Sequence, residues 1–146
     1  MELELALNRM AALCSASEHC ESEIREKLKR AALPADDIDA VIDRLYDGGF
    51  LDTARYCRAF ANDKLHFAHW GRLKIQQGLR LKGLPSSDIS EALNELPEDE
   101  YREVLEKLLE QKARTLTDED DYTRRGKLFR FAAGRGFTPG EIYNAL

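Results

Sequence analysis

One spacing of apolar residues occurs three times along the chain and restricts its possible folds more than any other feature. In each copy, five apolar residues follow one another at intervals of 4, 5, 5 and 4 positions. The copies are Ile24, Leu28, Leu33, Ile38 and Ile42; Ile75, Leu79, Leu84, Ile89 and Leu93; and Leu128, Ala132, Phe137, Ile142 and Leu146. They are offset by 51 and then 53 residues, and a proline follows the third member of each copy. Such self-similarity predicts the duplication of a structural unit.

Each unit is predicted to contain three helices. An interval of 4 places two apolar residues on one helix face, whereas an interval of 5 spans the turn to the next helix. A longer amphipathic segment precedes each pair of short helices, at roughly residues 2–14, 52–67 and 99–115. Val occurs only at positions 41 and 104, while residues that favour helices are abundant. The sequence therefore predicts an all-α protein.

We expect an elongated, solenoid-like array of three tandem three-helix repeats, nine helices in all, with each repeat packing mainly on its neighbours. The predicted boundaries within this single domain are 1–49 for repeat one, 50–98 for repeat two and 99–146 for repeat three. Helix ends are marked by Gly48–Gly49, Gly83 and Gly136, since glycine readily adopts the left-handed conformation there. Thr138-Pro-Gly-Glu141 predicts a capping box at the start of the last helix.

The composition is that of a globular protein. The chain has 146 residues, a formal net charge of −5 and no apolar stretch of the roughly 20 residues that a membrane span needs. Its acidic, helix-like start does not resemble a signal peptide. Three cysteines, Cys14, Cys20 and Cys57, are too few for a disulfide framework. We therefore expect a cytoplasmic protein without membrane contact.

Basic residues are concentrated in two stretches that contain no acidic residue, at positions 64–83 and 122–140. The first stretch carries Lys64, Arg72, Lys74, Arg80 and Lys82, and the second carries Arg124, Arg125, Lys127, Arg130 and Arg135. When the repeats are superposed, Arg72 coincides with Arg125, Lys74 with Lys127 and Lys82 with Arg135. Repeat one has Glu21, Glu23 and Ala31 at these positions. Repeats two and three thus share a basic constellation that repeat one lacks.

Two spaced basic clusters on a rod are suited to a linear polyanion such as nucleic acid. Trp70, Tyr122 and Phe129 lie among these cations and offer rings for stacking on bases, although core packing is the simpler interpretation for these aromatic residues, with Phe129 excepted. The alternative for the cations is a solvated face or compensation of helix dipoles. Compensation suits Lys82 and Arg135, which we place in last turns. It does not suit Arg72, Lys74, Arg125 and Lys127, which we place in first turns.

No catalytic constellation or cofactor site is recognisable in the sequence. It contains no glycine-rich phosphate loop and no nucleophile elbow. His66 and His69, with Cys57 or Cys20, do not match the ligand spacing of zinc sites. The run Asp118–Asp121 lacks the spaced ligands of a calcium loop, and we expect an exposed linker there. Asp52 is expected to cap a helix, and Cys14 and Cys57 to be buried.

Several segments together resemble the RecX family, the bacterial regulators of the RecA recombinase. They are Glu18-His19, Glu23-Ile24 and Lys27-Leu28; Leu51-Asp52-Thr-Ala-Arg55-Tyr56; Gly71-Arg72-Leu-Lys74-Ile75 and Lys82-Gly83-Leu84; and Arg125-Gly-Lys127-Leu128-Phe-Arg130-Phe131 with Arg135-Gly136-Phe137-Thr138. The resemblance covers nearly the whole chain. It implies a non-enzymatic protein of three-helix repeats that lies in the groove of the RecA–DNA filament and inhibits strand exchange.

The same resemblance implies that the partners are the RecA filament and the single-stranded DNA within it, and we expect a monomer. It also implies that the cations of repeats two and three contact DNA or the filament. The chain departs from the family pattern at Cys20-Glu21, at Ala31-Ala32 in place of a helix-ending glycine, and at Gly78 in the middle of a helix. No DNA contacts are therefore assigned to repeat one. The alternative function is a helical-repeat module that binds protein without contacting nucleic acid.

Overall fold

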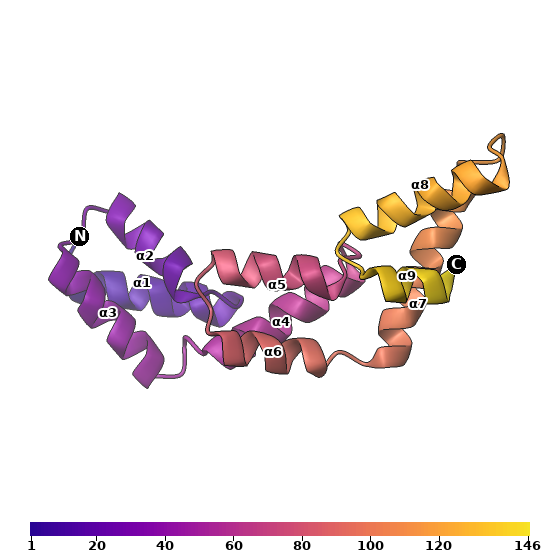
Figure 1. Ribbon diagram of the computed structural model, residues 1–146. Coiled ribbons are helices and arrows are strands. Elements are labelled where there is room, and N and C mark those ends of the chain that lie inside the picture. The colour runs from indigo at the N-terminus through magenta and orange to yellow at the C-terminus, as the bar shows by residue number, and fades with distance from the viewer.

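A computed structural model describes all 146 residues as nine α-helices without a strand (Figure 1). Repeat one contains α1 (Leu3–Ala16), α2 (Glu21–Arg30) and α3 (Ala35–Asp47); repeat two contains α4 (Thr53–His66), α5 (Arg72–Leu81) and α6 (Ser86–Asn94); repeat three contains α7 (Glu98–Ala113), α8 (Asp121–Gly134) and α9 (Pro139–Ala145). The prediction of an all-α chain of three-helix units is confirmed. None of the helices combines the length and apolar content that crossing a membrane requires.

The repeated apolar residues form the core of each unit. Fourteen of the fifteen are buried, and only Leu146 is partly exposed. Gly49, Gly83 and Gly136 have φ values of 75°, 84° and 97°, so they end helices in the predicted left-handed conformation. The capping box of Thr138 and Glu141 is present at the start of α9. These local features follow from residue types alone.

The packing between repeats differs from the expected uniform array. Repeat one has a core of its own, built from 11 buried residues between Ala6 and Leu51. Repeats two and three supply 20 of the 21 buried residues of a second core, in which α4 packs against α7, and Cys20 of repeat one is the remaining member. The protein is therefore an elongated molecule with two hydrophobic cores, and repeat one forms one end of it (Figure 1).

The second helices of the three repeats, α2, α5 and α8, follow one another head to tail along one side of the molecule (Figure 1). At the joint between repeats two and three, the Gly71 N–H donates to the Arg135 carbonyl at 2.7 Å and the Leu73 N–H donates to the Gly136 carbonyl at 3.0 Å. The start of α5 thus caps the end of α8 through backbone alone. Unpaired N–H groups at one helix start are satisfied by unpaired carbonyls at another helix end.

Gly71 is what permits this approach. A Cβ atom at position 71 would lie 2.5 Å from the carbonyl carbon and oxygen of Gly136. Cys20 occupies the corresponding position in repeat one, and its N–H donates instead to the Glu23 carboxylate at 3.0 Å. The two joints therefore differ because one of them has a glycine and the other does not.

The joint between repeats one and two is made by side chains. Ser22 Oγ donates to the Lys82 carbonyl at 2.9 Å, Lys82 Nζ lies 3.5 Å from Glu23, and Arg55 pairs with Glu18 at 2.5 Å. Burial favours a higher pKa for Glu23, but the hydrogen bonds from Cys20 and the charge of Lys82 outweigh it and lower that pKa. The carboxylate form of Glu23 is therefore the one that the joint stabilises.

Gly78 has a packing role inside α5. A Cβ atom there would lie 3.0 Å from Cζ of Phe60, whose ring covers this part of the helix. Glycine in a helix interior costs about 1 kcal/mol relative to alanine. The sequence alone did not explain a glycine inside this helix. The structure shows that Gly78 allows α4 to pack closely on α5.

The Gly71→Ala substitution is expected to separate α5 from α8. The added methyl group overlaps the Gly136 backbone, so the free energy of unfolding should fall by about 1–3 kcal/mol. Gly134→Ala is the matched control, because nothing lies within 4 Å of a Cβ at that position. Urea denaturation followed by circular dichroism measures both. Equal stability of the two variants would contradict the proposed role of the backbone contact.

The Ala32→Gly substitution is expected to stabilise repeat one. Ala32 follows α2 with a φ of 60°, where an L-residue with a Cβ is strained by roughly 1–2 kcal/mol. Glycine relieves this strain but loses more entropy on folding, so we expect a net gain of about 0.5–1 kcal/mol. Ala31→Gly, at a φ of −80°, should bring no gain in the same thermal unfolding measurement. A gain in both variants would show that strain at Ala32 is not the cause.

Candidate nucleic-acid interface

Of the ten cations expected to contact DNA, five are bound to other groups of the chain and five have no carboxylate partner. Four take part in ion pairs within the chain: Arg72, Lys82, Arg124 and Lys127. Arg135 donates to the Ala68 carbonyl at 3.1 Å and lies over the ring of Phe131. The other five have no carboxylate within 4.0 Å: Lys64, Lys74, Arg80, Arg125 and Arg130. Only this second group is free to bind an external anion without breaking an internal ion pair or a hydrogen bond of the side chain.

Arg72 lies at the centre of the joint between repeats two and three. Its guanidinium is 2.7 Å from Glu98 and 3.4 Å from Glu141, and its side chain is 21% exposed. The guanidinium also lies 4.0 Å from the ring centroid of Tyr101 and donates to the Leu93 carbonyl at 3.2 Å. These contacts make it a structural residue.

Tyr101 connects this network to α9. Its hydroxyl accepts from the Arg72 N–H at 3.0 Å and donates to Glu141 at 3.1 Å. Burial raises the pKa of Tyr101, so the hydroxyl keeps the proton that it donates. The cation in the first turn of α5 is thus compensated by carboxylates from repeat three, and its position gives no indication of a ligand.

The corresponding cations of α8 have different surroundings. Lys127 forms an ion pair with Glu119, whereas Arg125 is exposed and unpaired. Furthermore, α8 begins at Asp121 with Asp120 as its N-cap, so Arg125 and Lys127 lie beyond the first turn. The prediction that they occupy a first turn is wrong, because the Asp118–Asp121 run contains the start of the helix rather than only a linker. Equivalent repeat positions therefore do not have equivalent environments.

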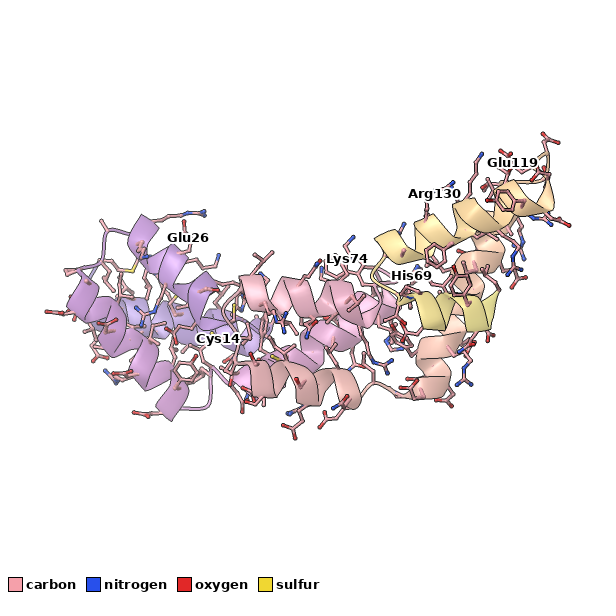
Figure 2. All side chains as sticks on the ribbon, in the orientation of Figure 1. Cys14, Glu26, His69, Lys74, Glu119 and Arg130 are labelled. Carbon is pink, nitrogen blue, oxygen red and sulfur yellow. The ribbon has the colours of Figure 1, made fainter.

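Lys64 and Lys74 both contact the ring of Trp70. Each Nζ atom is 4.8 Å from the ring centroid of the indole. The ring itself packs against the shared core of repeats two and three. Contact with an aromatic face holds an ammonium group in place but leaves its charge uncompensated. Lys74 on α5 and Arg130 on α8 point to the same side of the molecule (Figure 2).

A groove of about 480 Å³ lies between α8 and α9. Its walls include Arg125 and Arg130 and the rings of Tyr122, Phe129 and Tyr143. Tyr122 is 89% exposed, so core packing is the wrong interpretation for this ring. Sequence reasoning did not identify Tyr143, which is 61% exposed. The only sequence feature that could have pointed to Tyr143 is its position directly after Ile142, where a large aromatic residue stands outside the set of repeated apolar residues.

The structure brings no three potential metal ligands together. His66 Nδ1 lies 2.9 Å from the Asn62 carbonyl, and Cys14, Cys20 and Cys57 are buried. Asp52 accepts from the Arg55 N–H at 2.9 Å, as expected for a helix cap. These residues therefore contribute to the fold in ways that need no bound metal.

The contrast between Arg72 and Arg125 can be tested by stability alone. Arg72→Gln removes a largely buried guanidinium from its pairs with Glu141 and the exposed Glu98, and should lower the free energy of unfolding by about 1–3 kcal/mol. Arg125→Gln, at the same repeat position, should change it by less than about 0.5 kcal/mol. Urea denaturation of both variants provides the measurement. A similar loss for both would show that Arg125 also has a structural partner.

Comparison with known proteins places these observations in a family. Models of the first, second and third three-helix domains of RecX match residues 6–45, 52–93 and 98–146. The regulatory protein RecX of Prosthecochloris aestuarii is 33% identical over 97% of this chain and 91% of its own length. The regulatory protein RecX of Pseudomonas savastanoi pv. phaseolicola is 32% identical over 94% and 87%, respectively.

Solved structures agree in fold. A crystal structure of a regulatory protein RecX superposes with a TM-score of 0.88, covering 98% of this chain and 70% of that one, at 24% identity. The crystal structure of RecX from Lactobacillus salivarius superposes with a TM-score of 0.86 over 98% and 93%, at 18% identity. Three-helix units, their order along the chain and sequence identity over nearly the full length all agree, and the chain belongs to the RecX family of non-enzymatic regulatory proteins.

Proposed function

We propose that this protein binds along the RecA filament formed on single-stranded DNA and restrains RecA activity, chiefly strand exchange. Its unpaired cations contact DNA phosphates or acidic surface of RecA. The contact residues are Lys64, Lys74, Arg80, Arg125 and Arg130. This set is smaller than the one expected from the sequence, because the internally bound cations stabilise the array of repeats instead.

One observation carries this proposal. Lys74 of α5 and Arg130 of α8, neither paired with a carboxylate, lie on the same side of an elongated molecule, where the two helices follow one another end to end (Figure 2). A row of cations on a rod is suited to a regularly charged, extended partner. The net charge of −5 opposes strong binding to free DNA. The filament offers protein contacts in addition to phosphates, so it suits this surface better than free DNA.

Binding in this manner would inhibit RecA by occupation of the groove. A rod that contacts successive protomers bridges them and blocks the access of a second DNA strand. Repeat one adds its own core and a predominantly acidic surface to the rod, and protein contacts with RecA are assigned to it. The inhibitory step requires no chemical reaction, in agreement with a family of non-enzymatic regulators.

The triple variant Lys74→Gln, Arg125→Gln, Arg130→Gln tests the proposed contacts. Each phosphate contact that is lost should reduce the log–log salt slope of binding by about 0.7, so the slope should change by about 2 in total. Affinity for the filament at 0.1 M salt should fall by roughly tenfold or more. Fluorescence anisotropy of labelled protein, titrated with filament, measures both quantities. A strand-exchange assay reports the loss of inhibition.

The matched control is Arg9→Gln, Arg58→Gln, Arg102→Gln, which removes the same charge from three exposed arginines without carboxylate partners. If both triple variants bind equally weakly, only the overall charge matters and the assigned surface is wrong. If wild-type binding shows no salt dependence, the protein docks on RecA alone, as expected for a module without nucleic-acid contact. Undiminished inhibition by the folded test variant likewise contradicts the proposal.

A further inference from the structure

We propose that the groove between α8 and α9 binds an unstacked base of single-stranded DNA, with the flanking phosphates at Arg125 and Arg130. The choice of DNA as ligand rests on the function proposed above. What is added is a specific site, a mode of binding and a preference for single strands. The groove is lined by six residues that the argument uses: Tyr122, Arg125, Gly126, Phe129, Arg130 and Tyr143.

The aromatic rings of the groove are placed for stacking. The rings of Phe129 and Tyr143 pair with centroids 5.1 Å apart and planes inclined by 31°. Tyr143 and Tyr122 are largely exposed, although large aromatic side chains are usually buried. Rings held by a partner on one side and open on the other provide the surface on which bases of single strands stack.

The charges of the groove favour an anion. No carboxylate, including that of the terminal Leu146 at the edge of the groove, lies within 4.0 Å of Arg125 or Arg130, and no aspartate or glutamate lines the groove. The Arg130 guanidinium lies near Gly126, 3.4 Å from the position of a Cβ there. Glycine thus allows the Arg130 guanidinium to lie close against the helix backbone at this edge of the groove. A volume of about 480 Å³ falls within the roughly 300–1,000 Å³ typical of small-ligand sites, so a base fits.

The combination of rings and guanidiniums favours a polynucleotide over an acidic peptide. A carboxylate side chain needs the cations but has no flat surface for the rings. Duplex DNA supplies phosphates but keeps its bases stacked inside. Only a single strand satisfies both groups at once, because its bases are free to leave the stack.

Photo-crosslinking tests the site directly. A 15-nucleotide single strand carrying 5-iododeoxyuridine is irradiated with the full-length protein, and the crosslinked residue is identified by mass spectrometry. We expect crosslinks at Tyr122 or Tyr143. Gly126→Leu should abolish them, since its side chain displaces the Arg130 guanidinium and narrows the groove, while leucine favours the helix more than glycine does. Crosslinks elsewhere in the chain, or none at low salt, would overturn the inference.

Affinities of the variants for single-stranded and duplex DNA distinguish base stacking on the rings from attraction by the arginine charges. Tyr143→Ala and Tyr122→Ala should each weaken binding of the single strand, by roughly 5- to 150-fold for a ring that carries a stacked base. Tyr143→Phe retains the ring and should bind like the wild type. Neither alanine variant should affect binding of a blunt duplex of equal length. Leu81→Ala, at an exposed apolar residue of α5 outside the groove, is the control. Equal losses for single strand and duplex would contradict base stacking.

The outcomes also distinguish this inference from the proposed function. If the alanine variants bind free single strands normally but no longer inhibit RecA, the groove contacts protein and the inference is wrong, while filament regulation stands. If they lose crosslinking although the wild type proves not to bind the filament, the groove is a DNA site and the proposed function fails. Circular dichroism melts that match the wild type show that the variants are folded.

Discussion

The close approach of two backbones, at the start of α5 and the end of α8, determines how repeats two and three are arranged. Gly71 and Leu73 donate their N–H groups to carbonyls of repeat three, and this is possible only where neither partner has a Cβ in the way. The contact aligns two helices end to end and brings Arg72 to the acidic residues of α7 and α9. The shared core then continues from one repeat into the next.

The joint to repeat one shows what happens without that glycine. Cys20 keeps α2 from the same backbone contact, and two ion pairs and a hydroxyl group connect the repeats instead. Surface ion pairs contribute little to stability and are screened by salt. Repeat one has its own core and contributes only Cys20 to the core of the other two repeats, so it is held less firmly than those two hold each other. One duplicated unit has thereby produced a rigid pair and a more loosely attached neighbour.

Cations at equivalent positions of the duplicated unit differ because their surroundings differ. Arg72 is surrounded by side chains of repeat three, whereas Arg125 faces solvent in a groove of α8 and α9. The same side chain at the same repeat position therefore stabilises the fold in one unit and is available to a ligand in the other. Charge patterns in repeat proteins are consequently better assessed by what surrounds each copy than by their recurrence alone.

The number and type of the elements, the core residues and most helix ends could be predicted from the amino-acid sequence. These depend on apolar periodicity and on capping residues, which act over a few positions of the chain. Which cations are free became evident only from the folded chain. Arg72 and Glu141 are 69 positions apart, and Tyr143 shares a groove with Arg125 from another helix. No local pattern encodes such partners, because electrostatic pairing depends on distance in space and not on distance along the chain.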